Sequence, residues 1–152
     1  MRAVVQRVQW AIVEVDGRPA GRCGRGLLTY VGIGNASGED QAHWLAGKLA
    51  GLRIFEDDDG KLNRSVRDVG GGILAVPNFT LMADARKGRR PEFSAAACGE
   101  VARPLFEALV RAIRAAGVPA EQGVFGAHMQ IRSQADGPVN LLIEAPQSPP
   151  TP

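Results

Sequence analysis

Cysteine is scarce in this sequence, and long apolar runs are missing from it. Of the 152 residues only Cys23 and Cys98 are cysteines, and they stand far apart and outside any Cys-x-x-Cys pattern. This spacing argues against a disulfide scaffold and against a zinc site, so both thiols are expected to be small buried hydrophobes. No segment approaches the roughly 20 apolar residues that cross a bilayer. We therefore expect no membrane segment, no metal and no cofactor.

Side-chain arrangements that announce a catalytic nucleophile are also missing. His43 and His128 have no nearby carboxylate or cysteine partner in the sequence, and no Ser-His-Asp order can be assembled. The first 15 residues alternate apolar with polar side chains and lack the continuous apolar core of a signal peptide, so a cytoplasmic location is expected. The formal net charge is only +2, so any binding of nucleic acid has to come from a local patch.

The periodicity of the chain predicts one α+β domain over residues 1–145, followed by a disordered proline-rich tail over 146–152. Asp16-Gly17 predicts a tight hairpin turn, and Ser37 with Asp40 predicts a capping box at the start of a helix. Pro104 predicts a kink or a first-turn position in a second helix, which Gly117 would end. Helices are expected at 38–51 and 101–116, and strands of a largely antiparallel sheet at 3–8, 12–15, 26–34, 52–55, 73–76, 118–124, 129–133 and 139–144.

The most informative stretch is 69–93, where an apolar strand runs into small polar residues and then into a dense positive patch. Thr80 is either a packed β-branched strand residue or a functional hydroxyl. Pro77 predicts an edge strand or a bulge, and such a site leaves backbone N–H groups free to bind a carbonyl or an oxyanion. The patch, which suits a polyanion such as nucleic acid, consists of Arg86, Lys87, Arg89 and Arg90.

A second candidate is the dipeptide Gly137-Pro138. It is either a plain turn or a rigid peptide, with the cis isomer open to it, that presents carbonyl oxygens into a pocket.

Several segments together resemble one known family. MRAVVQRV, LRIFEDDDGKLN, NFTLMADARKGRRPEF, GVPAEQGVFGAHMQI and DGPVN occur in the order and at about the distances seen in the D-aminoacyl-tRNA deacylases of the bacterial and eukaryotic type. The resemblance covers nearly the whole chain, to about Glu144. It implies a barrel-like β-domain with two main helices, a homodimer with active sites at the subunit interface, and hydrolysis of the ester that joins a D-amino acid to the 3′ end of tRNA.

The resemblance also implies roles for individual residues. Gly137 and Pro138 would reach across from the partner subunit and reject L-amino acids, so that glycyl-tRNA is a second plausible substrate. The family's Ser-Gln-x-Thr motif falls on Pro77, Asn78, Phe79 and Thr80, the catalytic segment, whose main-chain amides would hold the substrate carbonyl while the terminal 2′-hydroxyl of the tRNA assists. Phe125 and Met129 would line the pocket for the terminal adenosine, Arg7 would hold the Gly-Pro loop, and Arg86, Lys87, Arg89 and Arg90 would contact acceptor-stem phosphates.

The chain departs from the family pattern inside its motifs. Pro77 replaces serine, Asn78 replaces glutamine, Asn140 replaces the threonine after Gly-Pro-Val, and His128 stands where an acidic residue is common. Proline at the first of these positions is also a trait of a related editing branch that removes a small L-amino acid such as alanine. Two alternatives to strict D-selectivity stay open: an editing enzyme for glycyl- or L-alanyl-tRNA, and a tRNA-end binding protein without catalysis.

Overall fold

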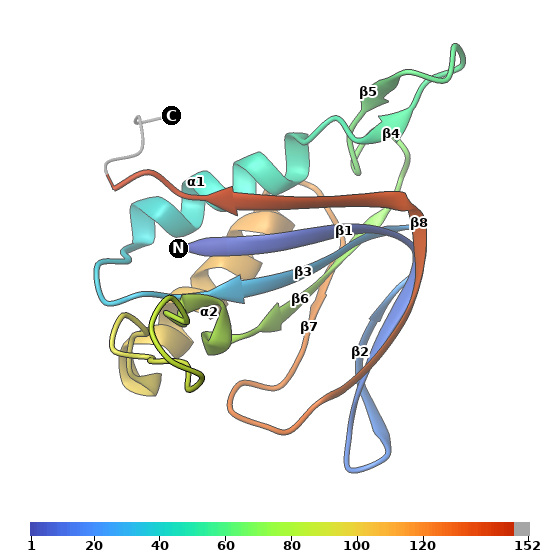
Figure 1. The fold of residues 1–152 in the computed structure, drawn as a ribbon. Coiled ribbons are helices and arrows are strands. Elements are labelled where there is room, and N and C mark those ends of the chain that lie inside the picture. Colours follow the sequence, from blue (N-terminus) through green and yellow to red (C-terminus); the bar gives the residue numbers. More distant parts are fainter. Residues whose placement is uncertain (148–152) are drawn as a thin grey trace.

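The fold is a strongly curved sheet with both α-helices packed against one of its faces (Figure 1). The structure is a computed structural model that describes residues 1–147. The elements are β1 (Arg2–Val15), β2 (Arg18–Cys23), β3 (Gly26–Gly32), α1 (Glu39–Gly51), β4 (Phe55–Glu56), β5 (Leu62–Arg64), β6 (Gly72–Pro77), the 3-10 helix η1 (Phe79–Met82), α2 (Gly99–Ala115), β7 (Ala120–Gln122) and β8 (Gln130–Glu144).

The main sheet has the order β2-β1-β3-β6-β7, with β8 on the other side of β1. β1 pairs antiparallel with β2, β3 and β8, so the predicted α+β class and the largely antiparallel sheet are confirmed. The pairs β3–β6 and β6–β7 are parallel, which the sequence did not indicate. Parallel neighbours need a crossover, and α1 and α2 lie in the two crossover connections.

The central strands β3 and β6 contribute to two cores because their side chains alternate between two faces. Leu27 and Ile73 face the helices and belong to the larger core, together with Leu45 and Leu109. Their neighbours Leu28 and Leu74 face the concave side, where they form a smaller core with Val8, Ala11, Val13 and Val76. The sheet therefore curls around its own apolar filling, as the resemblance to a barrel-like domain implied.

The first helix has the predicted buried face but not the predicted cap. Ala42, Leu45, Ala46 and Leu49 are all buried. The residue before the helix is Gly38, which has no capping side chain, so the predicted capping box at Ser37 is wrong. The Ser37 hydroxyl instead accepts a hydrogen bond from the Gly34 N–H at 3.1 Å and closes the turn before the helix.

The second helix begins earlier than predicted. It starts at Gly99, so Pro104 lies in its second turn and not in its first. Val101 is 45% exposed because it falls on the outer side of the first turn. Gly117 follows the last turn with φ +81°, in keeping with the predicted stop.

The other differences concern strand length. The segments expected at 129–133 and 139–144 are one strand, β8, which passes through Gly137-Pro138 with a cis peptide bond and irregular pairing to β1. β4 and β7 are shorter than expected, and β4 pairs only with β5 in a separate hairpin. The hairpin turn at Asp16-Gly17 is confirmed by positive φ angles at both residues.

The C-terminal segment is hydrogen-bonded to α1, and neither cysteine is fully buried. Pro146 accepts a hydrogen bond from the Gln41 side chain at 2.8 Å, and the rest of the predicted tail, 148–152, lies outside the described residues. Cys98 is exposed and Cys23 is only partly buried, so the expectation of two buried thiols is wrong. Within residues 1–147, no helix has both the length and the apolar character that crossing a membrane requires.

Candidate active site

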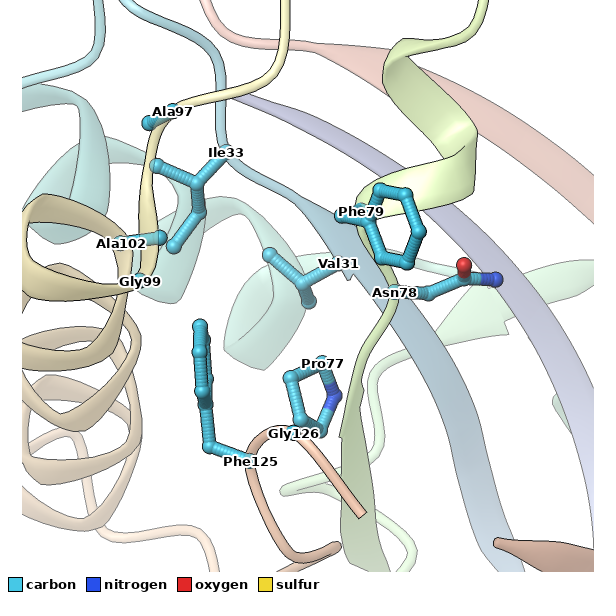
Figure 2. A pocket seen from close by; sticks show the side chains of 10 residues that line it. All are labelled: Val31, Ile33, Pro77, Asn78, Phe79, Ala97, Gly99, Ala102, Phe125 and Gly126. Atoms are coloured by element: carbon cyan, nitrogen blue, oxygen red, sulfur yellow. The ribbon is translucent and has the colours of Figure 1, made fainter. Parts of the chain in front are cut away.

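A small pocket lies where β6 ends and α2 begins (Figure 2). Its volume is about 190 Å³. Ligand pockets usually measure roughly 300–1,000 Å³, so this one suits a single ring or a small group better than a whole nucleotide. The pocket is lined by Val31, Ile33, Pro77, Asn78, Phe79, Ala97, Gly99, Ala102, Phe125 and Gly126.

The lining is almost entirely apolar. Asn78 is its one polar side chain, and Figure 2 shows that side chain directed away from the hollow between Pro77 and Phe125. No serine, cysteine, histidine or carboxylate is among the lining residues, and residues 1–147 contain no cluster of three His, Cys, Asp or Glu that could hold a metal ion. The lining of the pocket therefore offers main-chain groups but no ionisable side chain.

The main chain after β6 has a specific hydrogen-bond pattern. The Asn78 N–H donates to the Val31 carbonyl at 2.8 Å, and the Asn78 side-chain oxygen accepts from the Thr80 N–H at 3.1 Å and from the Thr80 hydroxyl. The Leu81 N–H donates to the Asn78 carbonyl at 3.3 Å. Within the part of the chain that the structure describes, this leaves the Phe79 N–H as the amide of 78–81 without an acceptor.

Thr80 is therefore a turn residue in this structure. It lies in η1, its side chain is exposed, and it is not part of the pocket lining. Its hydroxyl helps Asn78 to cap the 3-10 turn, a common use of an Asn side chain. The interpretation of Thr80 as a packed strand residue is wrong, since the strand has already ended at Pro77.

Pro77 lies at the end of an inner strand and not on an edge or a bulge. It pairs with Val31 of β3, whereas pairing with β7 stops two residues earlier at Ala75. A proline is tolerated here because no ladder on the β7 side requires its missing N–H. Its ring faces the Phe125 ring across the pocket (Figure 2).

Phe125 is packed from two sides and also lines the pocket. Its ring centroid lies 6.4 Å from that of the buried Phe106, and the Arg103 guanidinium lies 5.1 Å from the ring centroid. Met129 is not a lining residue; it packs against the smaller core, with its sulfur close to Gly123. Of the two residues expected to line a ring pocket, the structure places Phe125 in the lining and Met129 outside it.

Arg7 is buried and joins three segments of the chain. Its Nη1 donates to the Ile54 carbonyl at 2.7 Å, and its Nε donates to the Asp136 carbonyl at 3.1 Å. The Asp136 carboxylate lies 3.3 Å from Nε, and Glu56 lies 3.8 Å from Nη2. Arg7 therefore fixes the backbone immediately before Gly137-Pro138 to the base of the β4–β5 hairpin.

Gly137 cannot accept a side chain without a local shift. Its φ is +133°, and a Cβ built on it would lie 2.7 Å from the Val139 nitrogen. Gly137 and Pro138 are themselves exposed. Asn140, one of the departures from the family pattern, accepts a hydrogen bond from Gln6 across β1 and β8 at 3.0 Å.

Within one chain, Gly137-Pro138 lies far from the pocket. Pro77 is level with Ala3 of β1, whereas Gly137 is level with Arg7, and β6 is separated from β8 by β3 and β1. Three strand spacings of about 4.8 Å, with about four residues along the strands, give a separation on the order of 20 Å. The structure does not bring these two candidate regions together in one chain.

The four residues of the predicted basic patch are all exposed, and they lie in a loop whose ends are joined by backbone hydrogen bonds between Asp84 and Glu92. Arg86 is paired with Asp84, at 2.5 Å between Nη2 and Oδ2. Hydrogen bonds from Arg86 lower the pKa of Asp84 to about 2, so this pair stays ionised near neutral pH. Lys87, Arg89 and Arg90 form no ion pair with any described residue.

Other residues near the pocket were not indicated by the sequence. Phe93 packs on Phe79 at 5.1 Å between ring centroids and so joins the basic loop to the pocket wall. Ala97, Gly99 and Ala102 line the pocket because small residues at the start of α2 leave the space open. The run of small residues just before the second helix was the available signal. Neither His43 nor His128 lines the pocket.

Comparison with known proteins identifies relatives along nearly the full length. The family model described as D-Tyr-tRNA(Tyr) deacylase matches residues 4–144. The chain is 52% identical over 145 residues to the D-aminoacyl-tRNA deacylase of Desulfitobacterium hafniense, with 95% of this chain and 97% of that protein covered. It is 50% identical over 149 residues to the D-aminoacyl-tRNA deacylase of Thermus aquaticus, with 98% of each covered.

Two solved structures have the same fold. One, titled c-Myc DNA Unwinding Element Binding Protein, has a TM-score of 0.89 and 36% identity, with 96% of this chain and 99% of that chain covered. The other, titled as a probable eukaryotic D-amino acid tRNA deacylase, has a TM-score of 0.79 and 20% identity, with 93% and 97% covered. The second likeness concerns the fold alone.

We expect Arg7→Met to destabilise the protein and to loosen the Gly137-Pro138 segment. The change leaves the Ile54 and Asp136 carbonyls without their donor and Asp136 without its cation, and breaking a buried pair of this kind costs about 2–4 kcal/mol. Urea unfolding gives the change in stability, and hydrogen exchange at 54–56 and 135–139 reports the loosening. Arg132→Met is the matched control, because the pair that Arg132 forms with Glu14 is exposed on the arginine side. Equal losses in the two variants would contradict this role of Arg7.

Proposed function

Because the chain belongs to the D-Tyr-tRNA(Tyr) deacylase family and is a hydrolase of the ester bond in D-aminoacyl-tRNA, we propose that the 3′-terminal adenosine enters the pocket beside Phe125 with the ester carbonyl at the Phe79 N–H. The observation that carries this assignment is the coincidence of an apolar ring-sized pocket with one free amide in its wall. An aromatic ring facing a proline ring suits a flat base, and a free N–H suits a carbonyl oxygen.

The chemistry follows from the absence of ionisable side chains in the lining. Water attacks the ester carbonyl, and the negative charge on the tetrahedral oxygen is held by the Phe79 N–H. The bond between the carbonyl carbon and the ribose oxygen then breaks, and the ribose oxygen takes a proton that the attacking water has given up. The 2′-hydroxyl of the substrate lies next to that oxygen and assists the transfer. Asn78 and Thr80 act by holding the turn that leaves this amide free.

Selection against L-amino acids is assigned to Gly137-Pro138 of a second subunit. The pair lies on the order of 20 Å along the sheet from the pocket of its own chain, and it is exposed within the long edge strand β8. β8 spans 15 residues, and Leu142 on it is 62% exposed. Long exposed edges with apolar side chains favour pairing with another chain. A homodimer would cover this edge and deliver each Gly-Pro segment to the partner's pocket.

The acceptor stem is assigned to the loop that carries Lys87, Arg89 and Arg90. The loop is joined to the pocket wall by the contact of Phe93 with Phe79, so phosphates of a tRNA whose end occupies the pocket would lie near these charges. Arg86 contributes less because Asp84 already compensates its charge. A substrate of this kind also favours a cytoplasmic location.

The departures at positions 77 and 78 concern substrate choice more than hydrolysis. Pro77 lines the pocket, while the free amide belongs to Phe79, so the loss of the N–H and the hydroxyl at 77 removes no group that the proposed reaction uses. A proline ring does change the size of the hollow. Turnover of glycyl- or L-alanyl-tRNA is therefore the second candidate activity.

Purified protein is expected to release D-tyrosine from D-Tyr-tRNA and to leave L-Tyr-tRNA intact. Side-by-side rates on D-Tyr-, Gly- and L-Ala-charged tRNA would measure the contribution of Pro77, with Pro77→Ser as the matched variant. A faster rate on L-Ala-tRNA than on D-Tyr-tRNA would establish the shifted specificity. Binding of charged tRNA with no release from any ester would reject both catalytic assignments.

Thr80→Ala is expected to keep kcat/KM within about threefold of the wild type, since the Thr80 N–H still donates to Asn78 after the hydroxyl is lost. Asn78→Ala removes the acceptor of both Thr80 bonds and is expected to lower kcat/KM by about tenfold, the equivalent of ~1.4 kcal/mol. A near-complete loss of activity in Thr80→Ala would show that the hydroxyl takes part in the reaction.

Gly137→Ala and Phe125→Ala are each expected to abolish most activity, the first by displacing the Gly-Pro segment and the second by removing the ring wall. When the two variants are mixed and the subunits exchange, about a quarter of the wild-type activity should return, because half of the dimers are mixed and each mixed dimer has one intact composite site. Mass spectrometry of the mixture verifies the exchange. Exchange without recovery would assign Gly137 to its own chain's site.

A further inference from the structure

Arg103 is a charged residue placed at the pocket without being part of its lining. It is adjacent in sequence to Ala102, which lines the pocket, and its guanidinium lies over the ring of Phe125, which also lines it. The Phe125 ring therefore borders the pocket and also contacts Arg103. In Figure 2 the ring lies between α2 and Pro77.

The position of the guanidinium is not explained by an ion pair. Glu100 and Glu107 stand three residues before and four residues after Arg103 on α2, the two spacings at which helical ion pairs form. Neither carboxylate lies within 4.0 Å of Arg103, which has no ion-pair partner in the range 1–147. The side chain is exposed, so its positive charge remains available to a ligand.

The pocket offers no charge of its own to a ligand that carries a phosphate. Every lining side chain is uncharged. A nucleoside at the 3′ end of a nucleic acid brings one phosphate with it, on the 5′ side of the ribose. That phosphate stays outside a pocket of about 190 Å³ that accepts only the ring, and it is left at the rim. A guanidinium at the rim has the donors and the planar shape that phosphate oxygens require.

We propose that Arg103 binds the phosphodiester immediately 5′ of the terminal nucleoside, and that it does so while stacked on Phe125. This inference rests on the proposed occupation of the pocket by the terminal adenosine. The substrate would then have two distinct cationic contacts with the protein. Arg103 takes the last phosphate of the single-stranded end, while Lys87, Arg89 and Arg90 take phosphates further along the tRNA.

Arg103→Gln tests the proposal with two non-hydrolysable ligands. The first is 3′-(D-tyrosylamino)-3′-deoxyadenosine, and the second is the same compound with a 5′-phosphate. The wild type is expected to bind the phosphorylated ligand about fivefold more tightly, the usual scale for one exposed charged contact. Arg103→Gln should lose this preference and keep the affinity for the unphosphorylated ligand. Calorimetry measures both dissociation constants.

Kinetics on whole D-Tyr-tRNA gives a second readout. Arg103→Gln should raise KM about fivefold with little change in kcat, and the dependence of log(kcat/KM) on log salt should become shallower by about 0.7, the value for one phosphate of a single strand. Arg111→Gln is the matched control, because Arg111 is an exposed arginine of the same helix that borders the α1 side. Arg89→Gln should affect whole tRNA and leave both small ligands unchanged.

The outcomes are separable. If the wild type binds neither small ligand, the assignment of the pocket to the terminal adenosine fails. If it binds both and Arg103→Gln weakens them equally, Arg103 acts only by positioning Phe125, and the phosphate contact is wrong. If Arg103→Gln changes neither constant, or if Arg111→Gln produces the same effects on tRNA, Arg103 has no specific role.

Discussion

The end of β6 is the constraint on which the proposed site depends. β6 lies between β3 and β7, but β7 stops two residues before β6 does, so the chain leaves the sheet with ladder partners on one side only. The Asn78 N–H forms the last of these ladder bonds, to the Val31 carbonyl, and the Asn78 side chain then caps η1. Among the amides of 78–81, only that of Phe79 has no acceptor within residues 1–147, and it lies beside an apolar hollow. Unpaired amides at protein surfaces are potential oxyanion sites.

Arg7 has the complementary position further along β1, level with Gly137-Pro138. Its guanidinium binds carbonyls of Ile54 and Asp136, so the Gly-Pro segment and the β4–β5 hairpin are held to β1 as one unit. The cost of burying this charge is offset by hydrogen bonds and by the neighbouring carboxylates. The Gly-Pro segment is thus held in place by Arg7, yet it lies far along the sheet from the pocket of the same chain, which is the arrangement that a second copy would complete.

Sequence patterns predicted the features that depend on local periodicity or on backbone angles. The buried face of α1, the Asp16-Gly17 turn and the stop at Gly117 belong to this group. The family resemblance pointed to Pro77, Asn78, Phe79 and Phe125, which line one pocket in the structure, and also to Thr80 and Met129, which do not line it. Two interactions could not be derived from local patterns: the continuity of β8 depends on its pairing with β1 on both sides of Gly137-Pro138, and the pairing of Arg86 with Asp84 depends on the shape of the loop. The capping box predicted at Ser37 is wrong, and the cap that Asn78 forms on η1 was not predicted. In both cases a short polar side chain has several backbone partners within reach.

The apolar lining has a consequence for how the protein can evolve. A main-chain amide is present in every residue type except proline, so the group proposed for the chemistry survives almost any substitution at its own position. Pro77 stands two residues away, where no amide is required, and this explains how proline can occupy a motif otherwise headed by serine. If the Phe79 amide is the reacting group, side chains around the pocket can diverge and change which amino acid is accepted, while the reaction itself is inherited unchanged through the backbone.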